Sequence, residues 1–131
     1  MPRIHLDTNV LIGLLTPHGP ADRAVRHWML GGDTLGVSAF AWGEFCCGPA
    51  GAPLPEPIRQ LARRIVGEPE PLDAACAELA ASLFNATGRR RALLGDCFVA
   101  AAALRAEAAL ATSNVADFER FLPLGLQVVA V

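Results

Sequence analysis

The sequence contains no lysine, and this absence excludes two common kinds of chemistry. Its basic side chains, apart from histidine, are eleven arginines. Schiff-base formation needs an amine side chain, and the P-loop of nucleotide-binding proteins needs a lysine beside the phosphates. The chain therefore belongs to neither class, and any positive charge that it offers a ligand comes from arginine.

The sequence also lacks a membrane-length apolar run and any zinc-binding motif. Apolar stretches such as residues 97–104 are far too short to cross a bilayer, and an acid at position 7 comes too early for a signal peptide. The cysteines form no C-x-x-C pair, and no H-x₃₋₅-H partner accompanies them. We therefore expect a cytoplasmic protein without a membrane segment. Four buried free thiols are expected, at Cys46, Cys47, Cys76 and Cys97.

The remaining composition is that of a compact domain. Of 131 residues, 53% are hydrophobic and 18% are charged, which is enough apolar material for one buried core. The formal net charge of −2 excludes a nucleic-acid binder that acts through bulk positive charge. We expect residues 1–131 to form a single domain.

Short apolar strands alternate with helices along the chain. The pattern predicts strands at residues 3–6, 35–37, 109–112 and 127–131. It predicts helices at residues 10–15, 21–30, 39–47, 58–66, 73–86 and 97–106, and a short helical piece within 113–122. Residues 48–57, which hold four prolines and two glycines, are expected to form a loop or arm. This alternation indicates an α/β fold, with a central parallel sheet covered by helices on both faces.

Four acids stand in apolar surroundings. Asp7 follows the first predicted strand, Asp117 follows the third, and Asp96 opens the most apolar helix. Glu44 is the one charged residue of its predicted helix. Because the carboxyl ends of parallel strands meet at one edge of a sheet, we expect these acids to gather there. Each acid taken singly also has a structural explanation, since Asp7, Asp96 and Asp117 suit helix caps and Glu44 suits a solvated helix edge.

A bound cation explains why acids would be grouped in this way. Several carboxylates in one pocket repel one another and lose solvation, and a divalent ion removes that cost. Oxygen ligands without histidine or cysteine favour Mg²⁺ or Mn²⁺. Such ions activate water for phosphodiester hydrolysis and stabilise the leaving 3′-oxygen. The sequence leaves open whether one ion binds or two.

These segments resemble the motifs of the PIN domain family. Residues 4–12 (IHLDTNVLI) look like its opening motif, Glu44 matches its mid-chain acid, and residues 95–103 (GDCFVAAAA) and 110–118 (LATSNVADF) look like its third and fourth motifs. The order and spacing agree over nearly the full chain. The resemblance implies a PIN-like three-layer α/β sandwich, and a lone domain of this length is most similar to the VapC-type toxins of toxin–antitoxin pairs.

The resemblance also implies an activity and a site. It implies an endoribonuclease that depends on Mg²⁺ or Mn²⁺, forms a homodimer and is silenced by a cognate antitoxin protein. Carried over by position, the metal-binding and catalytic acids are Asp7, Glu44, Asp96 and Asp117, and the supporting polar residues are Thr8, Asn9, Thr112 and Asn114. Some members carry an acid where this chain has Asn114, so the fourth acidic role is divided between Asn114 and Asp117.

The candidate RNA-binding residues are arginines. Arg89, Arg90 and Arg91 lie just before Asp96, and a guanidinium pairs well with phosphate. A solvated basic loop or an antitoxin contact explains them equally well. The arm at 48–57 is free to frame the RNA or to clasp a second subunit.

Other readings of the acids are weaker. A receiver domain requires a lysine near its acids, and a haloacid-dehalogenase-type phosphatase requires Asp-x-Asp where this chain has Asp7-Thr8-Asn9. Two alternatives to a toxin stay open: a PIN nuclease of RNA processing or decay without an antitoxin, and a PIN-fold binding module without catalysis.

Overall fold

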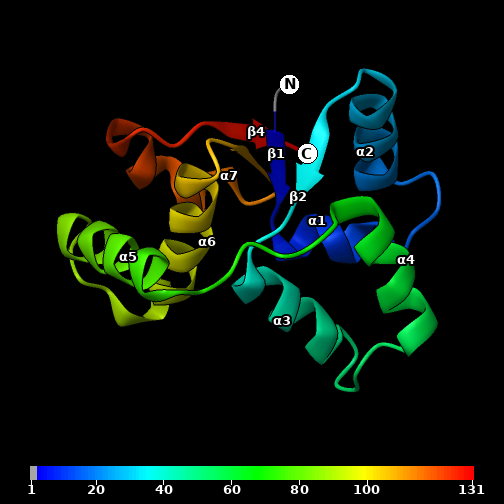
Figure 1. Ribbon diagram of the computed structural model, residues 1–131, viewed down its shortest axis with the longest axis horizontal. Helices are drawn as coiled ribbons and strands as arrows, with labels where there is room; N and C mark the ends of the chain where they lie inside the picture. The colour runs from blue at the N-terminus through cyan, green and yellow to red at the C-terminus, as the bar shows by residue number, and fades with distance from the viewer. Residues whose placement is uncertain (1–2) are drawn as a thin grey trace.

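The computed structural model describes residues 3–131, and a four-stranded parallel sheet lies at its centre (Figure 1). The strands are β1 (Arg3–Leu6), β2 (Thr34–Gly36), β3 (Ala109–Thr112) and β4 (Val128–Ala130), in the order β2-β1-β3-β4. Every neighbouring pair is parallel. The predicted parallel sheet is therefore confirmed, and the carboxyl ends of its strands share one edge.

Helices cover the sheet on both sides. Helices α5 and α6 lie on one side and α2 on the other, while α3 and α4 flank the lower end of the molecule as Figure 1 draws it. The helices are α1 (Thr8–Gly13), α2 (Pro20–Leu30), α3 (Ala39–Cys47), α4 (Glu56–Val66), α5 (Ala74–Ala86), α6 (Leu94–Arg105) and α7 (Val115–Phe118), with 3₁₀ turns η1 (Arg91–Leu93) and η2 (Glu119–Leu124). The three-layer α/β sandwich is confirmed. None of the helices in the described part of the chain has the length and apolarity needed to cross a membrane.

Local sequence signals fix where the helices begin. The Ser38 side chain accepts a hydrogen bond of 3.0 Å from the Ala41 amide at the start of α3, and the Asp73 side chain accepts one of 2.9 Å from Cys76 at the start of α5. Both are N-caps, which satisfy amides that have no partner within the helix. Helix α6 buries six of its twelve residues, and it packs beside β3 as its apolar sequence predicts.

Three predicted helix starts, those of α1, α4 and α6, are wrong by two residues or more. Helix α1 begins at Thr8 and ends at Gly13, whereas the apolar run predicted 10–15. Its first turn accepts the polar pair Thr8-Asn9 because the amides there need an outside partner, which Asp7 supplies. Helix α4 begins at Glu56 without a side-chain cap, and Pro57 suits its first turn because proline has no amide hydrogen that needs a partner there. The predicted arm at 48–57 therefore ends at residue 55.

Burial also corrects part of the predicted core. In α4 the apolar Leu61 would be expected to face the core, but it is 59% exposed, and the smaller Ala62 is buried. Helix α4 lies at the rim of the fold, so its inward stripe is narrow. All four cysteines are free thiols, yet Cys47 is exposed and Cys46 is half-buried. The prediction of buried thiols holds for Cys76 and Cys97 only.

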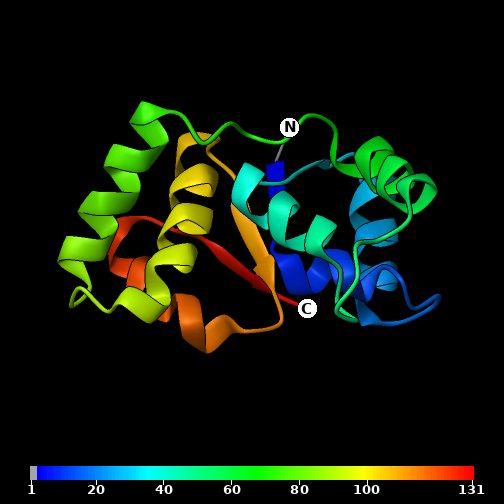
Figure 2. The ribbon, with the colours of Figure 1, turned by 90° about the horizontal axis from the view of Figure 1, so that it is seen from below.

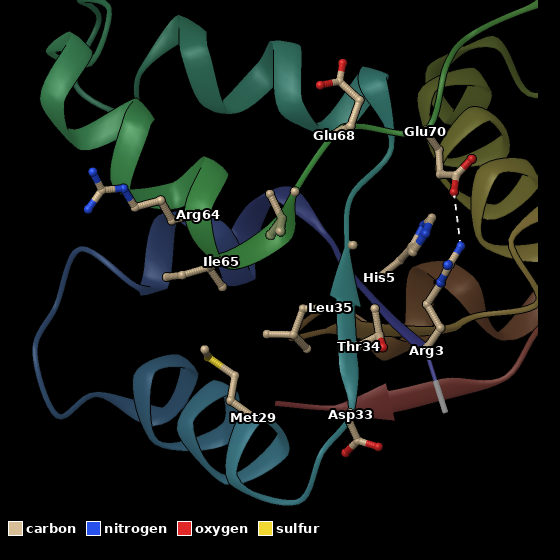
Figure 3. Close-up of a pocket in the computed structure, with 13 residues that line it drawn as sticks. Arg3, His5, Met29, Asp33, Thr34, Leu35, Arg64, Ile65, Glu68 and Glu70 are labelled. Carbon is tan, nitrogen blue, oxygen red and sulfur yellow. Dashed lines mark hydrogen bonds and ion pairs between the residues drawn. The ribbon is translucent and has the colours of Figure 1, made fainter. Parts of the chain in front are cut away.

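His5 lies in β1, and its buried imidazole makes no hydrogen bonds. It is 1% exposed, and neither ring nitrogen has a partner. Gly36 lies opposite it in β2, where a Cβ atom would come within 2.9 Å of the imidazole Cδ2, so the ring needs a glycine there. Figure 3 shows His5 beside the Arg3–Glu70 ion pair, whose atoms are 3.3 Å apart. Burial, and then the charge of Arg3, lowers the pKa of His5 to about 4.

Protonation of His5 should destabilise the fold as the pH falls. Above the unfolded pKa of 6.5 the ring is neutral in both states, and between 6.5 and about 4 the unfolded state alone takes up the proton. The free energy of unfolding should therefore fall by about 2–3 kcal/mol between pH 7 and pH 4.5 through this group. Urea unfolding of wild type and His5→Gln at both pH values measures it. Between pH 7 and pH 4.5 the variant should lose about 2–3 kcal/mol less stability than wild type. An equal loss in both proteins would contradict the lowered pKa of His5.

Candidate metal centre

Asp7 forms the most ordered part of the candidate site, at the end of β1. Its Oδ1 accepts a hydrogen bond from the Thr8 amide at 2.8 Å, so Asp7 is also the N-cap of α1. Its Oδ2 accepts bonds from Asn9 Nδ2 at 3.1 Å and from Thr112 Oγ1 at 2.8 Å. As a residue, Asp7 is 7% exposed. Burial raises the pKa of Asp7 above its ordinary value, although these donors oppose the rise, and the nearby Asp117 adds to it.

A network of polar groups joins the ends of β1 and β3. Thr112 is completely buried, and its hydroxyl donates to Asp7 while it accepts the Asn114 amide at 3.0 Å. Asn9 contributes both ends of its amide, because its Oδ1 also accepts the Ser113 amide at 3.1 Å. The predicted supporting residues Asn9 and Thr112 therefore hold Asp7 in place, and Asn114 takes part through its backbone.

Glu44 reaches the same region from α3. Its Oε1 accepts a hydrogen bond of 2.7 Å from Thr8 Oγ1, so Thr8 links the exposed Glu44 to the turn that Asp7 caps. Thr8 thus contacts both acids, one through its backbone and one through its hydroxyl. Glu44 is exposed, as a solvated helix edge would be, but its partner is a residue of the candidate site.

Asp96 lies in the first turn of α6, where it does not cap the helix. Helix α6 begins at Leu94, and its N-cap residue Leu93 makes no side-chain bond. The helical start comes earlier than predicted because the 3₁₀ turn η1 leads directly into it. Burial raises the pKa of Asp96, Arg120 opposes that rise, and the charges of Asp117 and Asp7 add to it. These three aspartates therefore lie within one another's electrostatic reach.

Asp117 and Arg120 approach from the turn after β3. Asp117 is an exposed residue within α7, which the Asn114 side chain does not cap. The Arg120 guanidinium lies 3.4 Å from Asp96 Oδ2. Sequence reasoning missed Arg120. Its spacing of three residues from Asp117 was the available signal, because residues so spaced share a helical face.

The side chains of the site are of the kinds that bind a hard divalent cation, but their present positions do not form a binding site for one. Carboxylate and hydroxyl oxygens are the ligands that Mg²⁺ and Mn²⁺ prefer, and grouped carboxylates with raised pKa values favour a cation. Across residues 3–131, however, no three His, Cys, Asp or Glu side chains are arranged to hold one ion. In their present positions the side chains of Asp7, Asp96, Asp117 and Glu44 therefore do not form a three-ligand site.

Of the three arginines that precede α6, one is engaged by other side chains and two are exposed. Arg89 has a positive φ of 56°, bonds to Asn85 Oδ1 and lies 5.5 Å from the centroid of the Phe84 ring. It is therefore turned back onto α5. Arg90 and Arg91 are exposed. A role of these arginines in RNA binding stays a prediction.

The hydroxyl of Thr112 should tune the acidity of Asp7. Thr112→Val keeps the shape but removes a donor to the ionised carboxylate, so it should raise the pKa of Asp7 further, whereas Thr112→Ser should leave it near the wild-type value. Carboxyl ¹³C chemical shifts followed against pH measure this. An Asp7 pKa that is the same in the valine variant and in wild type would show that the Thr112 hydrogen bond does not affect the acidity of Asp7.

Comparison with solved structures identifies the same architecture in toxin–antitoxin complexes. A chain of VapBC-1 from nontypeable Haemophilus influenzae matches with a TM-score of 0.75 at 22% identity, over 98% of this chain and 97% of that one. FitAcB from Neisseria gonorrhoeae matches with a TM-score of 0.70 at 21% identity, over 95% of each chain. A toxin–antitoxin complex from Klebsiella pneumoniae gives 0.71 at 23%, over 97% and 96%. At such identities the likeness establishes the fold.

Sequence comparison gives the family. A comparison with curated protein sequences finds no match. The model of the PIN domain matches residues 4–121, which is most of the chain and includes all four acids. PIN domains are nucleases, so the acids at the edge of the sheet are candidates for the nuclease site. The chain belongs to the PIN domain family.

Proposed function

We propose that this protein is a metal-dependent endoribonuclease and the toxin of a toxin–antitoxin pair. The observation that carries the proposal is the buried Asp7 carboxylate, which is fixed by three donors and lies in the field of Asp96 and Asp117. A structural cap needs no second and third acid beside it. The similarity to chains of VapBC and FitAB complexes supports the toxin assignment. A cytoplasmic location, with residues 1–131 acting as one domain, belongs to the same proposal.

The residues divide into fixed and adjustable ligands. Asp7 is held by Asn9 and Thr112, so it would fix the position of a bound Mg²⁺ or Mn²⁺. The half-buried Asp96 and the exposed Asp117 and Glu44 would complete the set. The ion would supply the positive charge that activates water and stabilises the leaving 3′-oxygen of the RNA. The new bond is between the water oxygen and phosphorus, and the bond to the 3′-oxygen breaks.

Cleavage of RNA should depend on the buried acids and on the metal. Purified protein incubated with cellular RNA and Mn²⁺ should cleave it, and EDTA should stop cleavage. Asp7→Asn and Asp96→Asn should lower the rate on the order of 100-fold or more, because each removes a ligand that carries charge. The readout is the rate at which a mapped RNA fragment appears.

The matched control is Glu78→Gln, which neutralises an exposed acid of α5 outside the site. It should cleave like wild type. Equal cleavage by wild type and the Asp7 and Asp96 variants would point to a contaminating nuclease. Absence of cleavage by fresh wild type with Mn²⁺ would favour a binding module.

An apolar groove lies between helices that also carry residues of the candidate site, and it is a candidate surface for binding a protein partner. A cavity of about 440 Å³ lies between α1, α3 and α4, where the 59% exposed Leu61 and the 38% exposed Leu15 line it together with Phe45. Phe45 of α3 directly follows Glu44 in the sequence. Leu11, which also lines the cavity, belongs to α1 together with Thr8. We propose that an apolar segment of a cognate antitoxin fills this groove, because it is lined by exposed apolar side chains and by helices that also carry Thr8 and Glu44.

Substitution in the groove should separate partner binding from cleavage. Leu61→Glu should weaken the complex with the product of a small neighbouring reading frame by about tenfold or more, since it buries a charge, and should leave cleavage by the free protein unchanged. Leu30→Glu, at an 89% exposed position of α2, is the control and should bind normally. Isothermal titration calorimetry measures both.

An equal effect of the two substitutions would remove the groove from the proposal, and a genome without such a reading frame would favour the nuclease of RNA processing or decay. The homodimer that the family resemblance implies stays a prediction, which light scattering of the free protein tests.

A further inference from the structure

Arg120 brings a positive charge to the acidic edge of the sheet. It belongs to η2, three residues after Asp117, and its side chain reaches back to α6, where Nη2 lies 3.4 Å from Asp96 Oδ2. Nη1 donates to the backbone carbonyl of Asp117. The side chains of Arg120 and Asp96 are 21% and 32% exposed, so this pair is partly screened from water.

No other basic side chain in residues 3–131 forms an ion pair with one of the four acids. The remaining pairs involve Glu70, Asp22, Glu68 and Asp73, which lie outside the site. The three arginines that precede α6 pair with none of the acids either. Arg120 is therefore the one described side chain that offsets the negative charge of the group.

The guanidinium of Arg120 lies against the Phe121 ring, whereas its contact with Asp96 is loose. Its Cζ lies 4.4 Å from the centroid of the Phe121 ring, and Phe121 is completely buried. A separation of 3.4 Å exceeds the usual 2.7–2.9 Å of a charge-assisted bond. The Nε atom is buried and has no partner. A guanidinium with an unused donor and a long ion pair loses little when it leaves that carboxylate.

We propose that Arg120 is an exchangeable counter-ion, which neutralises Asp96 in the free protein and gives up that carboxylate when a divalent cation binds. The proposal rests on the metal site assigned under the proposed function and adds the regulation of that site. It gives a reason why the acids do not converge on one point: Arg120 holds Asp96 towards η2. A divalent ion and a guanidinium repel each other, so both cannot share Asp96 at full strength.

Removal of the charge should strengthen metal binding. Mn²⁺ titrated into RNA-free protein, with free Mn²⁺ measured by electron paramagnetic resonance, should bind Arg120→Gln about three- to tenfold more tightly than wild type. Arg120→Lys keeps the charge and should stay within about twofold of wild type. A purely structural role predicts the opposite sign, since a loosened turn would weaken the site.

Arg26→Gln is the matched control, because Arg26 is an exposed arginine of α2 that pairs with Asp22 away from the acids. Its Mn²⁺ affinity should equal that of wild type. Thermal unfolding checks that each variant is folded. If Arg120→Gln does not fold, the Arg120 Hε resonance of wild type is followed by NMR during Mg²⁺ titration, and it should shift as the ion binds.

Three results decide the matter. Tighter Mn²⁺ binding by Arg120→Gln, or a shifted Hε resonance, supports the counter-ion. Unchanged or weaker binding by that variant, or an Hε resonance that Mg²⁺ leaves in place, overturns it while the proposed nuclease stands. Failure of wild type and all variants to bind Mn²⁺ overturns the metal site as well, and with it the proposed function.

Discussion

A parallel sheet forces its functional side chains together, and in this protein most of those side chains carry the same charge. Asp7 follows β1 and Asp117 follows the neighbouring β3, while α6 returns Asp96 to the same edge. Burial and mutual repulsion raise the pKa values of Asp7 and Asp96. Grouping them therefore costs free energy that the fold has to offset with donors and cations. The polar network around Asp7 and the guanidinium of Arg120 are the two devices that the described residues provide.

The two devices differ in rigidity. Asp7 is held by groups from the central strands and α1, namely Thr8, Asn9 and the buried Thr112, so its position is fixed by the same pairing that forms the core. Asp96 has a single long contact with an arginine. A site with one fixed acid and several movable ones can change its charge balance without disturbing the sheet. The apolar groove shares α1 and α3 with the site, which supply Thr8 and Glu44.

Much of this arrangement could be predicted from the sequence, because it depends on local signals. The strand that precedes Asp7 and the capping residue Ser38 are read from a few adjacent residues, and the structure has both in the predicted places. The errors arise where tertiary context decides. Exposure of Leu61 depends on how α4 lies across the rim. The contact of Arg120 with Asp96 joins residues 24 apart through a 3₁₀ turn that no periodic pattern announces. The roles of the four acids as ligands rest on the family resemblance and await experiment.

The choice of arginine at position 120 has a consequence for how the site can be switched. Arginine side chains are in general always protonated in proteins, unlike those of lysine and histidine. A lysine or histidine in the same place would lose its proton more easily once buried beside the Phe121 ring. On the arginine side, the Asp96 contact can then be broken only by displacement of the guanidinium. Since the chain contains no lysine, the permanently charged side chains that it can offer to phosphate or carboxylate are all arginines.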